Sequence, residues 1–430
     1  MKRRDALFLS PLMFAGMGGM AARAFAQGAV TVPSMDTPSL QAHDPLSLRY
    51  LRTIRGMLTR IRDTQSANLL EASHMFARKY LEGRTCWCSW DMGHGPNIDI
   101  LHPGRNGVPE IFTPGYDPKK SKPGDFFLKS TENGSLDEVD TKDMFVVGMP
   151  VPWGADAEKS ELLEDHVKKL KIRPFCDIWI ETGMTTLGAV MRVPGMTAPI
   201  GPESGIIGMV TFWMMAADAC RIIAREGRSA PVRGDEPVID WKKSPATLRS
   251  DPLMDDYFDA VISQMELIGS EMGAVRKAAK MAVESVLSGG RVYGYDRFGG
   301  FAAETRGRRG GLLLTQGITP NADGGLTDWN SWAGKETPSS KDLIIMGLSK
   351  PDDEVDLKAL DSIRKIGAKA VSIGPMTRDN KIPDGRTVAK ETDLHIGAMC
   401  DTYGLFAIPG FARKVCPTSG PLLNQIYWAM

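Results

Sequence analysis

Side chains of types that bind metal ions gather in the stretch WDMGHGPNIDILHPG. Asp91, His94, Asp99 and His102 fall within twelve residues, and the chain has only six histidines. Imidazole and carboxylate ligands together suit zinc or another transition metal. Their spacing matches no defined metal motif, however, and glycine and proline dominate the segment. We therefore predict a turn or a ligand-facing loop here, with no metal.

The better defined nucleotide and nucleophile motifs are absent from the sequence. No predicted strand leads into G-x-G-x-x-G with an acidic residue about twenty positions on, and there is no P-loop and no G-x-S-x-G elbow. Lys plus Arg and Asp plus Glu both total 52, so no global field favours nucleic acid or an anionic membrane. We expect no cofactor and no nucleic-acid partner.

The last segment of the sequence resembles an earlier one. VCPTSGPLLNQIYWAM at 415–430 resembles IGPESGIIGMVTFWMM at 200–215, with proline, serine, glycine, tryptophan and methionine each displaced by 215 positions. Three further pairs keep their order: Gly83–Cys88 with Gly290–Tyr295, Lys142–Gly148 with Lys341–Gly347, and Cys176–Ile180 with Thr392–Ile396. Ordered matches of this kind indicate a diverged duplication.

Hydrophobic periodicity predicts the same elements in both copies. Apolar residues three and four apart predict helices at 48–61 and 67–81 in the first copy, and at 253–268 and 275–287 in the second. The repeated apolar segments are predicted strands, with helices at 157–170 and 355–366 between the second and third of them. This alternation builds a parallel sheet covered on both faces. We predict domains at 44–227 and 252–430, joined by a linker at 228–250.

The first 26 residues form a predicted export signal. They have a basic start, an apolar stretch rich in glycine and alanine, and the cleavage motif Ala24-Phe25-Ala26. Arg3 and Arg4 are typical of a twin-arginine signal. We therefore expect a periplasmic protein with no membrane span after cleavage. Because such substrates fold in a reducing compartment, the six cysteines are interpreted as buried thiols.

The order of these motifs resembles the SIS domain, the sugar isomerase fold of phosphosugar isomerases and binding modules. Ser288–Gly294, Gly299–Glu304 and Ile366–Val371 resemble its "nGgrVyv.G", "GgSaaeA" and "kGakvi" segments, and Pro417–Ser419 and Pro202–Ser204 resemble the "PtSs" that opens its last helix. The resemblance covers 252–430 directly and 44–227 by way of the internal repeat. It implies two three-layer, doubly wound α/β domains of flavodoxin-like strand order, with the ligand at the carboxyl ends of the strands.

The predicted ligand loops depart from the family pattern. The first-loop serine of the family matches Phe301, and its "SxSGnT" loop has become Gly347–Asp353, with acids at Asp352 and Asp353. In the first copy, the corresponding loops contain prolines and Trp153. A proline removes a donor N–H, and a tryptophan offers a stacking face. These replacements favour a neutral sugar or sugar derivative over a phosphosugar.

The resemblance also implies roles for individual side chains. An isomerase of this family would transfer a proton through an enediol, with Glu304 as the base and Lys350 or His395 as the electrostatic helper. A helix-start carboxylate and a packed core histidine are the structural alternatives for Glu304 and His395. Ligand contacts are expected from Asp296, Arg297, Ser349, Asp352, Asp353, Thr418 and Ser419 of the second copy, and from Asp91, His94, Trp153, Glu203 and Ser204 of the first.

Several of these residues have a second explanation, because acids and hydroxyls at 352–353 and 418–419 would equally cap helices. Two functions of different classes remain open. The protein is either a sugar isomerase or a non-catalytic periplasmic protein that binds sugar or acts as a scaffold. The resemblance allows a homodimer in both cases.

Overall fold

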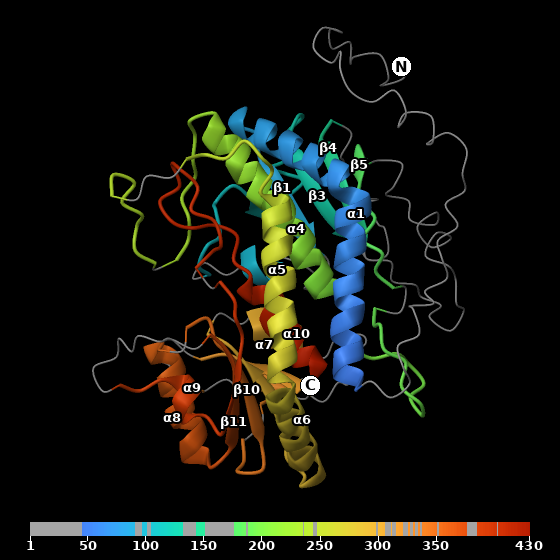
Figure 1. Ribbon diagram of the computed structural model, residues 1–430, viewed down its shortest axis with the longest axis vertical. Coiled ribbons are helices and arrows are strands. Elements are labelled where there is room, and N and C mark those ends of the chain that lie inside the picture. The colour runs from blue at the N-terminus through green and yellow to red at the C-terminus, as the bar shows by residue number, and fades with distance from the viewer. Residues whose placement is uncertain are drawn as a thin grey trace, which may run out of the picture. The chain divides into compact units, whose positions relative to one another are not determined.

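Two five-stranded parallel sheets form the framework of the computed structural model (Figure 1). Their strand orders are β2-β1-β3-β4-β5 and β12-β11-β10-β6-β7. Numbered along the chain within each sheet, both orders read 2-1-3-4-5, which confirms the predicted doubly wound, flavodoxin-like α/β class. The structure describes residues 45–430 apart from gaps at 91–96, 101–104, 132–142, 151–175, 186–187, 235, 244–246, 298–299, 306–310, 312–314, 321–325, 327–329, 332–333, 336–337, 351, 376–384 and 402.

The first copy begins with one long helix. The helices predicted at 48–61 and 67–81 are continuous, because no glycine or proline interrupts the polar residues between them. The elements are α1 (Leu46–Leu81), β1 (Cys86–Trp90), α2 (Asn97–Ile100), β2 (Thr113–Pro114), β3 (Phe126–Thr131), β4 (Phe145–Pro150), β5 (Ile178–Trp179) and α4 (Ser204–Arg225). The helix predicted at 157–170 lies outside the described residues.

The second copy has a break where the first has a continuous helix. A 3-10 turn at Gly269–Glu271 separates α5 (Met254–Ile268) from α6 (Met272–Leu287). The remaining elements are β6 (Val292–Tyr295), α7 (Gly300–Thr305), β7 (Thr315–Ile318), β8 (Asn330–Ser331), β9 (Gly334–Lys335), β10 (Leu343–Gly347), α8 (Glu354–Ile366), β11 (Lys369–Gly374), α9 (Val388–Glu391), β12 (Leu394–Gly397) and α10 (Ser419–Ala429). The helices predicted at 253–268, 275–287 and 355–366 are therefore confirmed.

The structure corrects one of the four repeat matches. Lys142–Gly148 leads into β4, the fourth strand of its copy, whereas Lys341–Gly347 leads into β10, the third strand of the other. The structural counterpart of Asp342 is Asp125. Each carboxylate accepts a hydrogen bond from the backbone N–H just before the first strand, at 2.9 Å for Asp342 and 3.1 Å for Asp125. Buried parallel strands all have similar runs of apolar residues. The sequence comparison therefore paired β10 with β4 instead of with β3.

The repeated endings are equivalent in three dimensions. Each begins the last helix of its copy, α4 or α10, as predicted. The hydroxyl of Tyr50 in α1 donates to the carbonyl of Pro202 at 2.6 Å, and the hydroxyl of Tyr257 in α5 donates to the carbonyl of Pro417 at 2.9 Å. The same tyrosine-to-proline bond therefore holds the start of the final helix in both copies.

The two copies share one apolar core. The largest buried cluster contains Leu128 and Phe212 of the first copy together with Ile345 and Leu422 of the second. Figure 1 shows α1, α4 and α5 running alongside one another, and α4 contacts both α1 and α5. Among the described helices, α4 is long and apolar enough to cross a membrane, but 94% of its apolar window is buried inside the fold. We therefore interpret α4 as a core helix.

The segment predicted as a linker packs against the second copy. Trp241 donates through its indole N–H to the carbonyl of Phe411 at 3.0 Å, and the guanidinium of Arg413 donates to the carbonyls of Val232 and Glu236. All six cysteines are free thiols, four of them fully buried and two partly buried. Cys220 and Cys416 are buried as predicted, whereas Cys176 and Cys400 are only partly buried.

Candidate functional site

The carboxyl ends of the second sheet carry most of the predicted ligand residues. Strand β6 ends just before Asp296 and Arg297, and β10 ends two residues before Ser349. Helix α10 starts at Ser419 and packs against β11, the neighbour of β10. Parallel strands end at the same edge, which is where doubly wound sheets bind their ligands. The topology therefore brings side chains from distant parts of the second copy to one edge.

An arginine of the first copy reaches into this edge. Arg105 donates through Nη2 to Ser419 Oγ at 2.9 Å and through Nη1 to Ser349 Oγ at 3.3 Å. Its Nε lies 2.9 Å from Asp99 Oδ1 in an ion pair. We call Asp99, Arg105, Ser349 and Ser419 the Arg105 cluster. It joins the two copies through polar side chains at the position where the family resemblance places the ligand.

The carboxylate of the cluster is fully buried. Asp99 has an exposed fraction of 0%, and its second oxygen accepts a hydrogen bond from Trp213 Nε1 at 2.9 Å. A Cβ on Gly420 would lie 2.7 Å from that oxygen, so only glycine leaves room for the carboxylate there. Burying a charge is unfavourable unless the charge is paired and hydrogen-bonded. Arg105 and Trp213 supply the pairing for Asp99.

A phenylalanine ring fills the position of the first-loop serine of the family. Phe301 in α7 is 4% exposed and packs edge-on against Tyr427, with ring centroids 5.7 Å apart. A Cβ on Gly347, the last residue of β10, would lie 2.6 Å from Phe301 Cγ. The space beside β10 that a small hydroxyl residue would leave open is occupied.

One of the two acids in the second loop caps α8. Asp353 caps this helix, since its Oδ1 accepts hydrogen bonds from the backbone N–H of Val355 at 2.9 Å and of Asp356 at 3.3 Å. Its other oxygen pairs with the guanidinium of Arg297. Asp352 is only partly exposed. Capping was one of the two explanations left open by the sequence, and for Asp353 the structure confirms it.

The first turn of α8 also contains a buried carboxyl, that of Asp356. Asp356 is 1% exposed, and its Oδ1 accepts a hydrogen bond from the hydroxyl of Tyr295 at 2.8 Å. Burial raises the pKa of Asp356 well above its ordinary value, and the neighbouring charge of Asp353 raises it further. Asp296 holds α7, because its Oδ2 accepts from the backbone N–H of Ala302 at 3.0 Å. These carboxyls organise the loops that follow β6 and β10.

At the starts of α10 and α4, the side chains of Thr418 and Glu203 make other contacts than the predicted ones. Thr418 makes no side-chain cap bond to α10, and its hydroxyl instead accepts from the backbone N–H of Asp401 at 2.8 Å. Glu203, its counterpart, is fully buried, and its Oε1 accepts from the backbone N–H of Thr185 at 2.9 Å. Both side chains anchor the preceding loop to the helix start. Ser204 is also buried, with an exposed fraction of 1%.

No contact that the structure describes joins the three residues predicted to be catalytic. Glu304 lies in α7 with 2% of its surface exposed. The ammonium of Lys350 lies 5.3 Å from the ring centroid of Tyr403. The Nδ1 atom of His395, in β12, lies 2.8 Å from Ser372 Oγ in the adjacent strand β11. Burial lowers the pKa of His395 to about 4, so its imidazole is neutral near pH 7.

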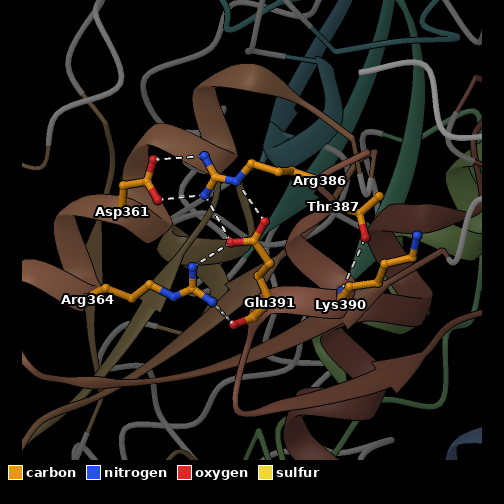
Figure 2. A network of polar contacts seen from close by, with 6 residues as sticks. All are labelled: Asp361, Arg364, Arg386, Thr387, Lys390 and Glu391. Carbon is orange, nitrogen blue, oxygen red and sulfur yellow. Dashed lines mark hydrogen bonds and ion pairs between the residues drawn. The ribbon is translucent and has the colours of Figure 1, made fainter. Parts of the chain in front are cut away.

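A surface ion-pair network accounts for Glu391, just before β12 (Figure 2). Its carboxylate pairs with Arg386 at 2.7 Å and with Arg364 of α8 at 2.5 Å. Arg386 also pairs with Asp361 at 2.7 Å. These bonds lower the pKa of Glu391, chiefly through Arg386. The network fastens α9 to α8 and takes no part in the Arg105 cluster.

Most of the ligand residues predicted in the first copy are not described by the structure. Asp91, His94, His102 and Trp153 lie outside the described residues, so their predicted roles stay predictions. Asp99, considered above as a metal ligand, is instead an ion-pair partner of Arg105. No group of three or more metal-binding side chains occurs in the part of the chain that the structure describes.

Sequence reasoning missed Arg105. The residue lies just beyond the stretch WDMGHGPNIDILHPG, and nothing in its neighbours distinguishes it from a surface arginine. Its hydroxyl partners are 244 and 314 positions away. The carboxylate six positions earlier, Asp99, was the one available signal, because a fixed charge within a glycine-rich turn needs a partner.

No protein-family model and no curated protein matches the sequence. Solved structures resemble the chain weakly. A protein provisionally named a phosphosugar isomerase from Clostridium difficile shares 10% identity at a TM-score of 0.45, over 89% of this chain and 91% of its own. The C-terminal domain of glucosamine-fructose-6-phosphate aminotransferase from Francisella tularensis shares 11% at 0.44, over 90% and 96%. Tagatose-6-phosphate ketose/aldose isomerase from Escherichia coli shares 14% at 0.39, over 90% and 92%. At these identities and scores the likeness decides neither the family nor the activity of this chain.

Proposed function

We propose that this protein binds a neutral carbohydrate derivative at the carboxyl edge of its second sheet and does not isomerise it. The observation that carries the proposal is the Arg105 cluster, in which one guanidinium links the hydroxyls of Ser349 and Ser419. Ser349 follows β10 and is partly exposed, whereas Ser419 opens α10 and is fully buried, so a ligand would meet the cluster at Ser349. The second copy would therefore bind its ligand with help from the first.

Local charge favours a neutral ligand. The positive charge of Arg105 is balanced by Asp99 at 2.9 Å, so the guanidinium is not free to neutralise a phosphate. The ring of Phe301 occupies the space beside Gly347 that a phosphate cradle would need. An anion placed against the Arg105 cluster would lose its hydration and would meet a guanidinium whose charge Asp99 already balances.

Partly exposed side chains near the cluster offer the chemistry that sugars need. Ser349, Lys350, Asp401 and Tyr403 are all of intermediate exposure. Their hydroxyl, ammonium and carboxylate groups can bind sugar hydroxyls, and the ring of Tyr403 offers an apolar face. Asp401 is oriented by the side chain of Gln264, which donates to its Oδ2 at 2.7 Å.

The absence of turnover follows from the positions of the predicted catalysts. A general base must lie within hydrogen-bond reach of the proton that it removes. Glu304 is almost completely covered, and His395 is bonded to Ser372 within the sheet. Neither lies in the Arg105 cluster. A binding role without proton transfer agrees better with these positions than an enediol mechanism does.

Thermal-shift measurements with neutral and phosphorylated sugars test the proposal. We expect neutral sugars or their derivatives to stabilise the wild-type protein and Lys350→Gln to weaken that response. Lys390→Gln, at an exposed lysine in α9, is the control and should respond as wild type does. Stabilisation by phosphosugars alone would contradict the neutral ligand.

Proton exchange separates binding from catalysis. The stabilising sugar is incubated with the protein in deuterated water, and its carbon-bound protons are followed by NMR. We expect no deuterium to enter the sugar. Exchange that disappears in Glu304→Gln would show that the protein is an isomerase, with the predicted base.

We also propose that the protein is exported by the twin-arginine route, on the evidence of residues 1–26 in the sequence alone. A bacterial host should accumulate the protein in the periplasm, with Gln27 as its first residue by mass spectrometry. Replacing both Arg3 and Arg4 by lysine should keep the full-length chain in the cytoplasm. Periplasmic accumulation of that variant would contradict the route.

A further inference from the structure

An apolar cavity of about 330 Å³ opens beside the second sheet, away from the Arg105 cluster. Its walls come from the start of α1, from α6, from β6 and β10, and from the end of α10. Among the lining residues are Tyr50, Ala282, Val292, Ile345 and Trp428. None of the four residues of the Arg105 cluster lines it. The cavity is therefore distinct from the proposed sugar site.

The rim of this cavity exposes large apolar side chains. Leu287 is 82% exposed, Val283 is 56% exposed and Leu46 is 42% exposed, and all three line the opening. Single exposed apolar residues are ordinary, but several around one concave apolar surface are typical of a binding site.

In the first copy, the equivalent groove is covered by a helix. Helix α4 has 22 residues and α10 has 11. The second half of α4 covers the groove of the first copy, where Ser73 Oγ donates to the carbonyl of Met215 at 3.0 Å and the thiol of Cys416 hydrogen-bonds to that of Cys220.

The repeat identifies the corresponding positions in the second copy. In the structure, Gly83 and Gly289 both follow the end of their helix with a positive φ, at an offset of 206, one residue from the sequence match of Gly83 with Gly290. At this offset Ser73 corresponds to Ala279, and at the offset of 215 Cys416 corresponds to Gly201. Both Ala279 and Gly201 line the cavity. The apolar groove that a helix fills in the first copy is thus open in the described part of the second.

The cavity wall also restricts the charge of an occupant. No lysine, arginine, histidine, aspartate or glutamate side chain is among the described lining residues. The polar groups on the wall include the hydroxyls of Thr305, Thr315 and Tyr427, and the last two are hydrogen-bonded to each other. An anion buried here would have no cationic side chain among the described lining residues to pair with, whereas a neutral hydroxyl or amide would find partners.

We propose that this cavity is a second binding site, for a neutral, largely apolar small molecule. Its size suits a molecule of on the order of ten carbon atoms, since each methylene or water fills about 30 Å³. The apolar part lies against α6 and the sheet, and a hydroxyl or amide group faces Thr315 and Tyr427. The site does not depend on the sugar proposal.

Decanol and decanoate test this proposal as a matched pair of probes. Titration followed by tryptophan fluorescence and calorimetry should show one decanol per chain, and decanoate at pH 8 should bind at least about tenfold more weakly. Ala282→Phe fills the cavity and should weaken decanol binding at least about tenfold while keeping or raising the thermal midpoint. Val238→Phe is the control, because Val238 is 62% exposed and lies outside the cavity.

Three results would overturn the proposal. The first is that the wild-type protein does not bind decanol up to its solubility limit. The second is that Ala282→Phe binds decanol as tightly as Val238→Phe does. The third is that the wild-type protein is a dimer that Leu287→Glu converts to a monomer, because the groove would then be a surface for self-association.

Discussion

At the scale of single residues, the site depends on one buried ion pair. Asp99 is fully buried and Arg105 nearly so, and the pair connects the first copy to hydroxyls of the second. Type and spacing made Asp99 one of four possible metal ligands, but the prediction for its segment was a turn or a ligand-facing loop with no metal. The ion pair could not be predicted, because the partners of Arg105 come together only when two distant loops fold against each other.

Removing one member of this pair should destabilise the protein strongly. Arg105→Met leaves the carboxylate of Asp99 buried without its cation, and we expect a loss of about 3–5 kcal/mol in the free energy of unfolding. The double variant Asp99→Asn/Arg105→Met should recover much of that loss. Urea denaturation measures both. The exposed pair Arg55–Glu266, with side chains 51% and 58% exposed, provides the control, and Arg55→Met should cost at most about 1 kcal/mol.

The buried carboxyl of Asp356 should make stability depend on pH. Burial raises its pKa above the ordinary value of 3.8, so the folded protein binds a proton there more tightly than the unfolded chain does. The stability that this carboxyl contributes is complete below about pH 4 and is lost as the pH rises.

Asp356→Asn removes this dependence and can still accept the hydrogen bond from Tyr295. We expect the variant to be more stable than the wild-type protein at pH 7, by about 1 kcal/mol, and the difference to shrink toward pH 4. Thermal unfolding across that pH range measures it. A difference that grows toward low pH would mean that Asp356 is stabilised as a carboxylate.

At the scale of elements, periodicity predicted the helices well and the strands incompletely. The helices at 253–268, 275–287 and 355–366 agree with the structure to within about three residues. Strand β3 was missed although Pro123-Gly124 just before it is a turn signal, because its apolar sequence FFLKST resembles those of the neighbouring strands. That omission caused the incorrect match between β4 and β10.

The loops that enter the two final helices need a left-handed residue at the same place. Gly201 has a φ of 80° and its counterpart Cys416 has a φ of 63°. Cys416 is the only residue other than glycine with a positive φ in the part of the chain that is described. The same left-handed conformation in both copies, strained only at Cys416, shows that the chain direction there is set by the fold and not by the residue.

Two glycines of the hairpin before α4 allow the cost of a side chain at positive φ to be distinguished from the cost of steric crowding. Gly195 and Gly201 both have positive φ, but a Cβ at 195 would meet nothing within 4 Å, whereas one at 201 would lie 2.9 Å from the ring of Tyr50. We expect Gly195→Ala to cost about 1 kcal/mol and Gly201→Ala to cost about 1–3 kcal/mol more. Urea denaturation of the two variants measures the difference. Equal losses would show that the ring of Tyr50 moves aside freely.

At the scale of the whole molecule, the duplication forms a single compact unit from Asp44 to Met430. The shared core and the contacts of α4 with α5 and α10 leave each copy without a complete core of its own. We therefore expect one cooperative unfolding transition for this unit. Calorimetry and denaturation followed by both circular dichroism and tryptophan fluorescence would test it, and two separated transitions would contradict a shared core.

The sequence by itself determined the duplication and the α/β class, because helical periodicity and short buried strands repeat locally along the chain, whereas the strand order was expected only from the resemblance to the SIS domain. It also determined that the loops lack the residues of a phosphate cradle. Only the tertiary structure decided that Arg105 reaches Ser349 and Ser419, that Phe301 fills the space beside Gly347, and that an apolar groove lies open beside α6. Each of these depends on contacts between residues far apart in sequence, which no local pattern records.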